Sequence, residues 1–595
     1  MKLALQAACA SALLLSGCGK KALEPAAFEA LTSEFVHSSL ALSPVSATSV
    51  GLHTHNGVKL DEKLDDMRPA GMEAQRKHWR EWQSRLNGLD GEKFDAESQA
   101  DLDLMKNQVE LALLDLDTIQ SWRHNPTVYV ELAGNALFTP YSVDYAPAAE
   151  RWNHIIARLE ALPALAGAAK QNLLDSNAVW TRVAIDENDG NLALIEKEFP
   201  GKVPAELKAR YDAAAGPAAA ALRGLSEHLK TLKDTGAGGW RLGKENYARK
   251  FKLVVGEETT PDKLLADAEA ELLALRKRMF MVSLPLHVKY YPTHKDPVDL
   301  NLIVGETLAK VALKHVTADR YFDEAKKTLE ETRAFLKSHE DRLVKMPGRD
   351  NLQLIETPAF MRGIYGVGGF SPAPALQPEL GAFYWLTPIP KDWPKERVES
   401  KLREYNDYGL RILTIHEAIP GHYVQFEYAN QVQPPSRRLL RAVFGNGPYI
   451  EGWAVYATDI MLREGYLDRN PEMELTWCKQ LLRAVSNTIL DIRMQTMGMS
   501  DEEAMKLMTE RTFQEREEAV AKLQRAKLSS CQLPTYYAGY RAWKEMRAAA
   551  EKKAGAGFKP GEFHQKALAE GNLPVASVAR MLGLTPAPAP PASGN

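Results

Sequence analysis

Apolar residues spaced three and four positions apart recur along most of this chain, and this period is the feature that most restricts its fold. Side chains at this spacing share one face of an α-helix, which can then be buried against a neighbour. One such segment opens with Thr260 as a candidate N-cap and Pro261 at the first helical position. We therefore predict a mainly α fold. Two of the stripes are Leu102, Met105, Val109, Leu113 and Leu116, and Leu265, Ala268, Leu272, Leu275 and Met279.

The pattern changes between residues 351 and 390. The runs NLQLIETPAF and GAFYWLTPIP are short, contain β-branched or aromatic residues and are bounded by Pro and Gly, so they predict two short strands. The glycine-rich segment between them, RGIYGVGGFSPAPAL, predicts a flexible loop. It lacks the Lys-Ser/Thr that ends a phosphate-binding loop, which argues against that function. The helical pattern resumes near Lys395 and continues to about Ala579.

The first residues predict a lipid anchor. They combine Lys2, an apolar run from Leu3 to Leu15 that is too short to span a membrane, and the sequence LSGC ending at Cys18. LSGC resembles a bacterial lipobox, in which the cysteine is lipid-modified and becomes the mature N-terminus. A plain signal peptide cleaved nearby is the alternative. We expect a protein anchored in the bacterial cell envelope, and Gly19 favours the outer membrane, facing the periplasm.

Composition argues against other classes of function. The chain has 595 residues with 74 Lys and Arg against 77 Asp and Glu, a net charge of −3, and no basic block that would suggest nucleic-acid binding. Beyond the first residues only Cys478 and Cys531 remain, too few for a zinc site of four thiolates. They could pair as a disulfide, but buried free thiols are favoured.

The segment HEAIPGH, from His416 to His422, predicts a metal site of modified geometry. In a regular helix two residues six positions apart point about 240° apart and cannot share a metal. Pro420 lacks the N–H that would bond to the carbonyl of His416, so the helix must break or widen there. Gly421 gives the backbone the freedom to turn His422 back. The alternative is a helix end that happens to contain two histidines.

A second segment supplies a third candidate ligand. About thirty residues after His422, the turn-like GNGP leads into YIEGWAVYATDIMLREGY, which reads as a helix with Glu451 in its first turns. Two His and one Glu are a standard ligand set for catalytic zinc, which keeps one position open. The alternative reading is an ordinary carboxylate at a helix N-terminus.

Together these motifs resemble the bacterial family filed as domain of unknown function 885. HEAIPGH followed by EGWAVYA matches its H-E-x-x-P-G-H and E-G-W-x-x-Y pattern, and SCQLPTYYAGY resembles its C-terminal P-G-Q-A-x-x-Y-x-x-G. The similarity covers roughly residues 28–584. It implies a large, mostly helical fold related to the gluzincin zinc peptidases, with a small β element lining the cleft, and metallopeptidase activity. The chain departs from the pattern at Tyr423, Thr458, Gln495, Ser530 and Cys531.

A mechanism follows if Zn²⁺ is held by His416, His422 and Glu451. The metal would lower the pKa of a water molecule, and Glu417 would accept its proton and pass it to the leaving amine. The resemblance places Tyr536 as the donor to the oxyanion, with Tyr537 and Tyr540 as rivals.

Other parts of the chain could bind the substrate. Arg525, which matches the family's arginine, could hold a substrate carboxylate, although a surface ion pair is an equal alternative, and Tyr537 is a further candidate contact. The strand GAFYWLTP could offer an edge to an extended peptide, and the glycine-rich loop could close over it.

These observations define one organisation and a leading function. We expect a lipoprotein signal peptide at 1–17, a tether at 18–27, an N-terminal helical region at 28–345, a catalytic region at 346–584 and a disordered tail at 585–595, with 28–584 forming one family domain. The predicted function is an envelope-anchored zinc metallopeptidase that cleaves peptides. The alternatives are a zinc amidohydrolase or esterase, and a catalytically silent lipoprotein that binds peptides or scaffolds other proteins. Specificity and oligomeric state stay open.

Overall fold

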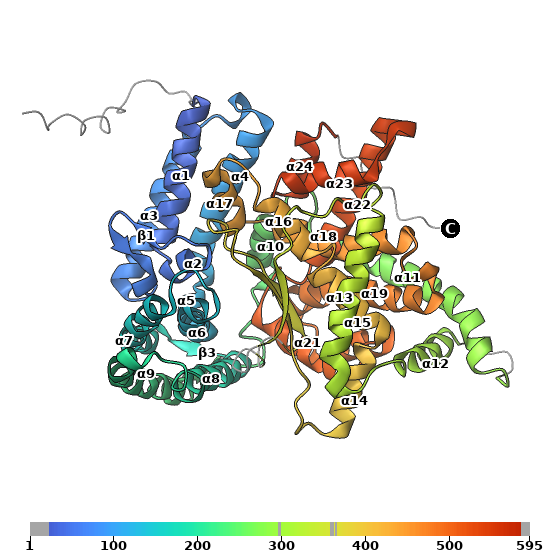
Figure 1. Ribbon diagram of the computed structural model, residues 1–595, viewed down its shortest axis with the longest axis horizontal. Coiled ribbons are helices and arrows are strands. Elements are labelled where there is room, and N and C mark those ends of the chain that lie inside the picture. The colour runs from blue at the N-terminus through green and yellow to red at the C-terminus, as the bar shows by residue number, and fades with distance from the viewer. Residues whose placement is uncertain (1–22, 295–298, 358–361, 363–365, 585–595) are drawn as a thin grey trace, which may run out of the picture.

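The computed structural model describes residues 23–294, 299–357, 362 and 366–584, and it is mainly helical, as predicted (Figure 1). Cys18 and the tail at 585–595 lie outside these residues. The first half of the chain forms α1 (Pro25–Ala41), α2 (Pro44–Ser49), α3 (Pro69–Asn87), α4 (Ala96–Leu114), α5 (Ser121–His124), α6 (Thr127–Ser142), α7 (Ala148–Asn172), α8 (Ala178–Ala193), α9 (Lys208–Leu229), α10 (Gly243–Val254), α11 (Pro261–Tyr290), α12 (Leu300–Ala312) and α13 (Tyr321–Ser338).

The helices of the second half run from just after the β segment to the end of the described chain. They are α14 (Lys395–Glu404), α15 (Asp407–Glu417), α16 (His422–Ala429), α17 (Pro435–Val443), α18 (Gly447–Arg463), α19 (Pro471–Thr496), α20 (Asp501–Lys506), α21 (Arg516–Leu528), α22 (Thr535–Ala554), α23 (Pro560–Ala569) and α24 (Val575–Met581).

The predicted start of α11 is confirmed, whereas α1 begins earlier than expected. Thr260 accepts a hydrogen bond from the backbone N–H of Lys263, and Pro261 is the first residue of α11. By contrast, residues 25–27, expected in the tether, already belong to α1, because Pro25 is a favourable first helical residue.

Two hydrophobic cores organise the helices. The main core joins residues from α1 and α4 to residues from α10, α11, α13 and the helices from α15 to α24. The second core lies mainly within α6, α7, α8 and α9, which form a lobe at the lower left of Figure 1. The main core therefore includes residues on both sides of position 345, and the second core is centred on residues 127–229.

In its described residues, the segment between positions 351 and 390 forms three strands instead of two. They are β5 (Leu352–Glu356), β6 (Gly368–Ser371) and β7 (Ala382–Leu386), in the order β5-β7-β6. β5 is parallel to β7, with Leu352 opposite Ala382, and β6 is antiparallel to it, with Gly368 opposite Leu386. β6 lies in the segment expected to be a loop. Since β7 is hydrogen-bonded on both sides, it cannot offer the free edge predicted for GAFYWLTP; β6 and β5 are the edge strands.

Smaller features complete the fold. β1 (Thr54–His55) pairs antiparallel with β2 (Val58–Lys59), and β3 (Asp175–Ser176) pairs parallel with β4 (Lys233–Asp234). Cys478 and Cys531 are buried and not bonded to each other. Within the described ranges no helix combines the length and apolarity needed to cross a bilayer.

Candidate metal centre

The HEAIPGH segment breaks the helix where the sequence predicts. α15 ends at Glu417 and α16 begins at His422, with a cis peptide bond between Ile419 and Pro420. The backbone N–H of Gly421 reaches back to the carbonyl of Ile415 at 2.9 Å. Trp453 on α18 donates its indole N–H to the carbonyl of Pro420 at 2.9 Å, which holds the junction against the next helix.

Glycine at position 421 is required by a close backbone approach. A Cβ atom there would lie 2.0 Å from the carbonyl oxygen of His416 and 2.2 Å from that of Ile415. Both distances are far below van der Waals contact, so the chain could not turn in this way with any other residue. The turn brings the imidazoles of His416 and His422 together, with ring centroids 4.7 Å apart.

Glu451 reaches the two histidines from α18. Asn446 caps this helix by accepting from the backbone N–H of Tyr449 at 3.0 Å, and Pro448 lies in its first turn. Gly452 then allows α22 to cross at backbone contact, because a Cβ atom there would lie 2.3 Å from the carbonyl carbon of Gly539. The crossing brings the start of α22 to the same place as Glu451.

The donor atoms of the three side chains fit a single zinc ion. The Nε2 atoms of His416 and His422 lie 3.4 and 3.6 Å from Oε2 of Glu451, and one donor atom from each residue lies within 4.8 Å of the other two. Ligands bound tetrahedrally to zinc at about 2.0–2.1 Å lie about 3.3 Å from one another. The observed spacing is close to this value and too wide for good hydrogen bonds.

The electrostatics of the group also fit a bound cation. Oε2 of Glu451 and Nδ1 of His422 are buried without a hydrogen-bond partner. Burial by itself would raise the pKa of Glu451, but the two histidines hold it well below its usual range. Burial opposes the charged form of His422 as well, yet Glu451 and Glu417 raise its pKa. An anionic carboxylate facing two imidazoles is the environment that a divalent metal prefers.

Gln425 is placed to orient His422. It lies one turn further along α16, and its Nε2 donates to Oδ1 of Asn572 at 2.6 Å. Oε1 of Gln425 is buried and has no hydrogen-bond partner. The same is true of Nδ1 of His422, which lies on the same helix. An acceptor for the second ring nitrogen is the usual support of a metal-binding histidine. The sequence analysis did not identify Gln425 as a site residue.

Two further predicted residues lie at this site. Glu417 is the last residue of α15, half-buried and next to His416 in the chain, and its charge contributes to the raised pKa of His422. Tyr536, in the first turn of α22, stacks on His416 with ring centroids 6.3 Å apart. Burial and the charge of Glu451 raise the pKa of Tyr536, so its hydroxyl keeps its proton.

Arg525 connects α21 to this tyrosine. Its guanidinium donates to Oη of Tyr536 at 3.3 Å and to Oε1 of Gln532 at 3.0 Å. Arg525 is exposed, so the same guanidinium can also face a ligand.

The rival tyrosines are not brought to the site. Tyr537 is buried in the core and donates to the backbone carbonyl of Asp267 at 3.3 Å, and Tyr540 is buried and donates to Asp459 at 3.3 Å. The predicted substrate contact by Tyr537 therefore has no support in the geometry. The helical period explains this, because adjacent residues on α22 point in different directions.

Three of the residues that depart from the family pattern, Tyr423, Gln495 and Cys531, make structural contacts. Tyr423 donates to the carbonyl of Arg349 at 3.1 Å and accepts from the backbone N–H of Asn351 at 2.9 Å. Gln495 accepts from the backbone N–H of Leu242 at 2.9 Å, and the N–H of Cys531 bonds to Asp491. These contacts hold neighbouring segments together and involve none of the metal-site side chains.

The edge strand β6 borders the site and was missed at the level of sequence. Phe370 on β6 stacks against His422, with ring centroids 6.2 Å apart at 25°, and also contacts Phe426. Since this strand was expected to be a loop, no signal had placed it against the metal ligands. A cavity of about 970 Å³ lies elsewhere, between α7 and the segment around residues 59–68, and includes none of the predicted site residues.

Comparison with known proteins agrees with this arrangement of motifs. The family described as "Bacterial protein of unknown function (DUF885)" matches residues 44–582. The chain belongs to the DUF885 family. A structure from Shewanella oneidensis, described as a putative lipoprotein of unknown function, is 30% identical, with a TM-score of 0.77 over 94% of this chain and 100% of that one.

A second structure, described as the putative lipoprotein from Colwellia psychrerythraea, shares the fold at 17% identity. Its TM-score is 0.73 over 93% of this DUF885 chain and 98% of that one. A search of curated proteins finds no match.

Proposed function

We propose that this DUF885 protein is a zinc metallopeptidase anchored to the cell envelope by lipid on Cys18. The observation that carries the proposal is the convergence of His416, His422 and Glu451 on one point, with Glu417 and Tyr536 beside it. Zinc bound there would supply a Lewis acid that activates water and polarises a scissile carbonyl.

The other side chains would move protons and stabilise charge. Glu417, half-buried and next to His416 in the chain, is placed to accept a proton from the attacking water and return it to the leaving amine. Tyr536, whose raised pKa keeps the hydroxyl protonated, is placed to donate to the developing oxyanion. Arg525 orients this hydroxyl through the 3.3 Å contact to it.

Two basic side chains on α21, Lys522 and Arg525, favour a substrate with a free carboxylate. Lys522 lies three residues before Arg525 and is buried. Burial and the charges of Arg483 and Arg525 hold its pKa well below the usual range. An incoming carboxylate would offset that penalty and pair with the exposed guanidinium of Arg525.

The sheet supports an extended peptide as the substrate. β6 is an edge strand and carries Phe370 against His422, so a peptide paired with it would pass the metal site. Here β6 takes the role predicted for the strand GAFYWLTP. The small sheet would then line the substrate cleft of a gluzincin-related fold.

Location in the envelope is part of the same proposal. The two similar structures are of proteins described as lipoproteins, and LSGC ends at Cys18 in this chain. Lipid on Cys18 would anchor the protein to the outer membrane, facing the periplasm.

The proposal is tested by measuring zinc content and peptide hydrolysis in the wild-type protein and two variants. The wild-type mature domain should bind zinc at this site and hydrolyse mixed short peptides. Glu451→Ala should lose that zinc, whereas Glu417→Gln should keep it and lose hydrolysis by at least about a hundredfold. Full activity of Glu417→Gln would contradict the mechanism. Zinc binding with hydrolysis only of non-peptide amides or esters would indicate the amidohydrolase or esterase alternative. Zinc binding without any hydrolysis would indicate a peptide-binding or scaffolding lipoprotein.

A further inference from the structure

We propose a second zinc site, formed by His287, His294 and Glu306 at the junction of α11 and α12. His287 is in the last turn of α11, His294 follows that helix, and Glu306 lies on α12. The proposal does not depend on the metallopeptidase function, because it uses none of the residues of the first site.

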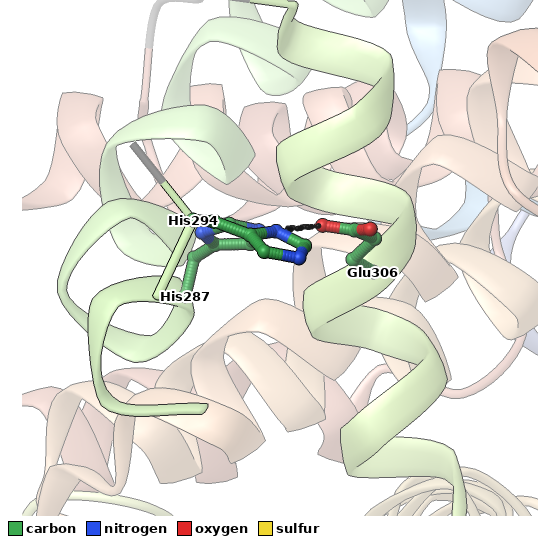
Figure 2. A group of neighbouring side chains, drawn as sticks. All are labelled: His287, His294 and Glu306. Carbon is green, nitrogen blue, oxygen red and sulfur yellow. Dashed lines mark hydrogen bonds and ion pairs between the residues drawn. The ribbon is translucent and has the colours of Figure 1, made fainter. Parts of the chain in front are cut away.

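The donor atoms converge on one carboxylate oxygen. Nε2 of His287 and Nδ1 of His294 lie 2.7 and 3.4 Å from Oε2 of Glu306, and the three donor atoms lie within 4.8 Å of one another. Figure 2 shows the two imidazole rings overlapping and facing the carboxylate across the gap between the two helices. Ligands of one tetrahedral zinc are about 3.3 Å apart, so small adjustments of the exposed side chains would complete the site.

Aromatic packing fixes the two rings before any metal binds. Tyr291 stacks on His287 with ring centroids 5.0 Å apart and on His294 with ring centroids 4.9 Å apart. Its hydroxyl donates to the backbone carbonyl of Glu306 at 3.3 Å, and the ammonium of Lys310 lies over its ring. Because Tyr291 joins both histidines to α12, the ligands lose little freedom when they bind a metal.

The three proposed ligands differ in how far their side chains are exposed to solvent. The side chain of His287 is only 3% exposed, whereas those of Glu306 and His294 are 27% and 41% exposed. The site is therefore anchored on the buried side and open to water, which can fill the fourth position of zinc.

The position of the site favours a structural role. α12 lies at the lower right of Figure 1, at the edge of the molecule. Zinc at this place would tie the end of α11 to α12 and thereby brace α12 on the body of the protein. A divalent ion can do this more strongly than one imidazole–carboxylate pair at the surface.

Zinc stoichiometry of the full mature chain tests the inference. After incubation with zinc and removal of the excess, we expect two zinc ions per wild-type chain and one in both His294→Ala and Glu306→Gln. These two variants alter the exposed ligands, so folding should be unaffected, and peptide hydrolysis should stay at the wild-type level. His315→Ala is the matched control, because His315 faces Glu399 at 3.3 Å in a simple pair; it should keep two zinc ions.

The outcomes distinguish this site from the first one. Glu451→Ala should also bind one zinc, and Glu451→Ala combined with His294→Ala none. Zinc should still raise the melting temperature of Glu451→Ala, and that shift should vanish in the double variant. Unchanged zinc content in His294→Ala and Glu306→Gln would overturn the second site. Loss of zinc in these variants with no loss in Glu451→Ala would support it while contradicting the first.

Discussion

At the scale of single residues, the metal centre depends on groups that touch its ligands as well as on the ligands. Nε2 of His422 lies 3.6 Å from Oε2 of Glu451, and Gln425 on the same helix helps to raise the pKa of His422. Asn572 fixes the amide of Gln425 from a distant part of the chain. The orientation of His422 is therefore set by residues far apart in sequence.

Replacing Gln425 with Ala should weaken zinc binding without unfolding the protein. The change removes a side chain that acts on His422 and helps to raise its pKa, so the ring should be less firmly oriented and we expect the zinc Kd to rise about 10–100-fold. Competition with a chromophoric chelator measures this. Gln514→Ala is the control, because Gln514 is also buried but bonds to Ser486 and Thr512; an equal effect of both variants would contradict a specific role for Gln425.

Glu187 on α8 should make stability depend on pH. Burial, together with the charges of Glu131 and Asp186, raises its pKa to about 8, and its Oε2 has no partner. The folded state therefore binds this proton more tightly than the unfolded state. The resulting stability is fully present below about pH 4.5 and is lost as pH rises toward 8.

Glu187→Gln removes this titration. It should raise the free energy of unfolding by about 1–3 kcal/mol at pH 9 and change it little at pH 4. Urea unfolding at the two pH values gives the comparison, with exposed Glu206→Gln as the control. A gain of the same size at both pH values would show that burial of the charge is not the cause.

At the scale of elements, two glycines allow the helices that carry the site to meet. Gly539 on α22 lies against the backbone of α18, where an added Cβ would be 1.9 Å from the carbonyl oxygen of Pro448 and 2.7 Å from the Cα of Gly452. Side chains at this crossing would push α22, and with it Tyr536, away from Glu451.

Gly539→Ala should therefore destabilise the protein and reduce hydrolysis more than zinc binding. Overpacking at a rigid contact costs about 1–3 kcal/mol, and α22 carries Tyr536 but none of the metal ligands. Urea unfolding, zinc content and turnover measure the three effects. Gly216→Ala on α9 is the control, since an added Cβ there meets nothing within 4 Å. Unchanged stability and turnover in Gly539→Ala would show that α22 can shift freely.

At the scale of the whole molecule, the lobe of residues 127–229 is built around the second hydrophobic core, which also includes Met67, Met72, Leu116 and Trp122. Phe138 on α6 packs against Trp385 on β7, and Trp180 on α8 donates to the carbonyl of Lys527 at the end of α21. These contacts attach the lobe to the sheet and to the helix that bears Arg525.

Separate cores predict two unfolding transitions. Hydrogen exchange in increasing urea should show α6–α9 losing protection at a different midpoint from α15–α22. Zinc should raise only the second midpoint, because each bound ion adds about 2.7 kcal/mol to the free energy of unfolding at a hundredfold excess over Kd. Glu451→Ala should reduce this gain and leave the lobe unchanged. A single transition that zinc shifts as a whole would mean that the two cores unfold together.

The sequence by itself determined the helical class, the N-cap of α11, the break at Pro420-Gly421 and the membership of His416, His422 and Glu451 in one candidate site. Each of these follows from local chemistry, such as helical period, a missing N–H or a motif. Only the tertiary structure decided that β6 and not β7 is the edge beside His422, that Tyr536 and not Tyr537 stacks on His416, and that Gln425 is held by Asn572. It also brought His287, His294 and Glu306 together, which no motif indicated. These are contacts between segments distant along the chain, and their geometry depends on how whole helices and strands pack.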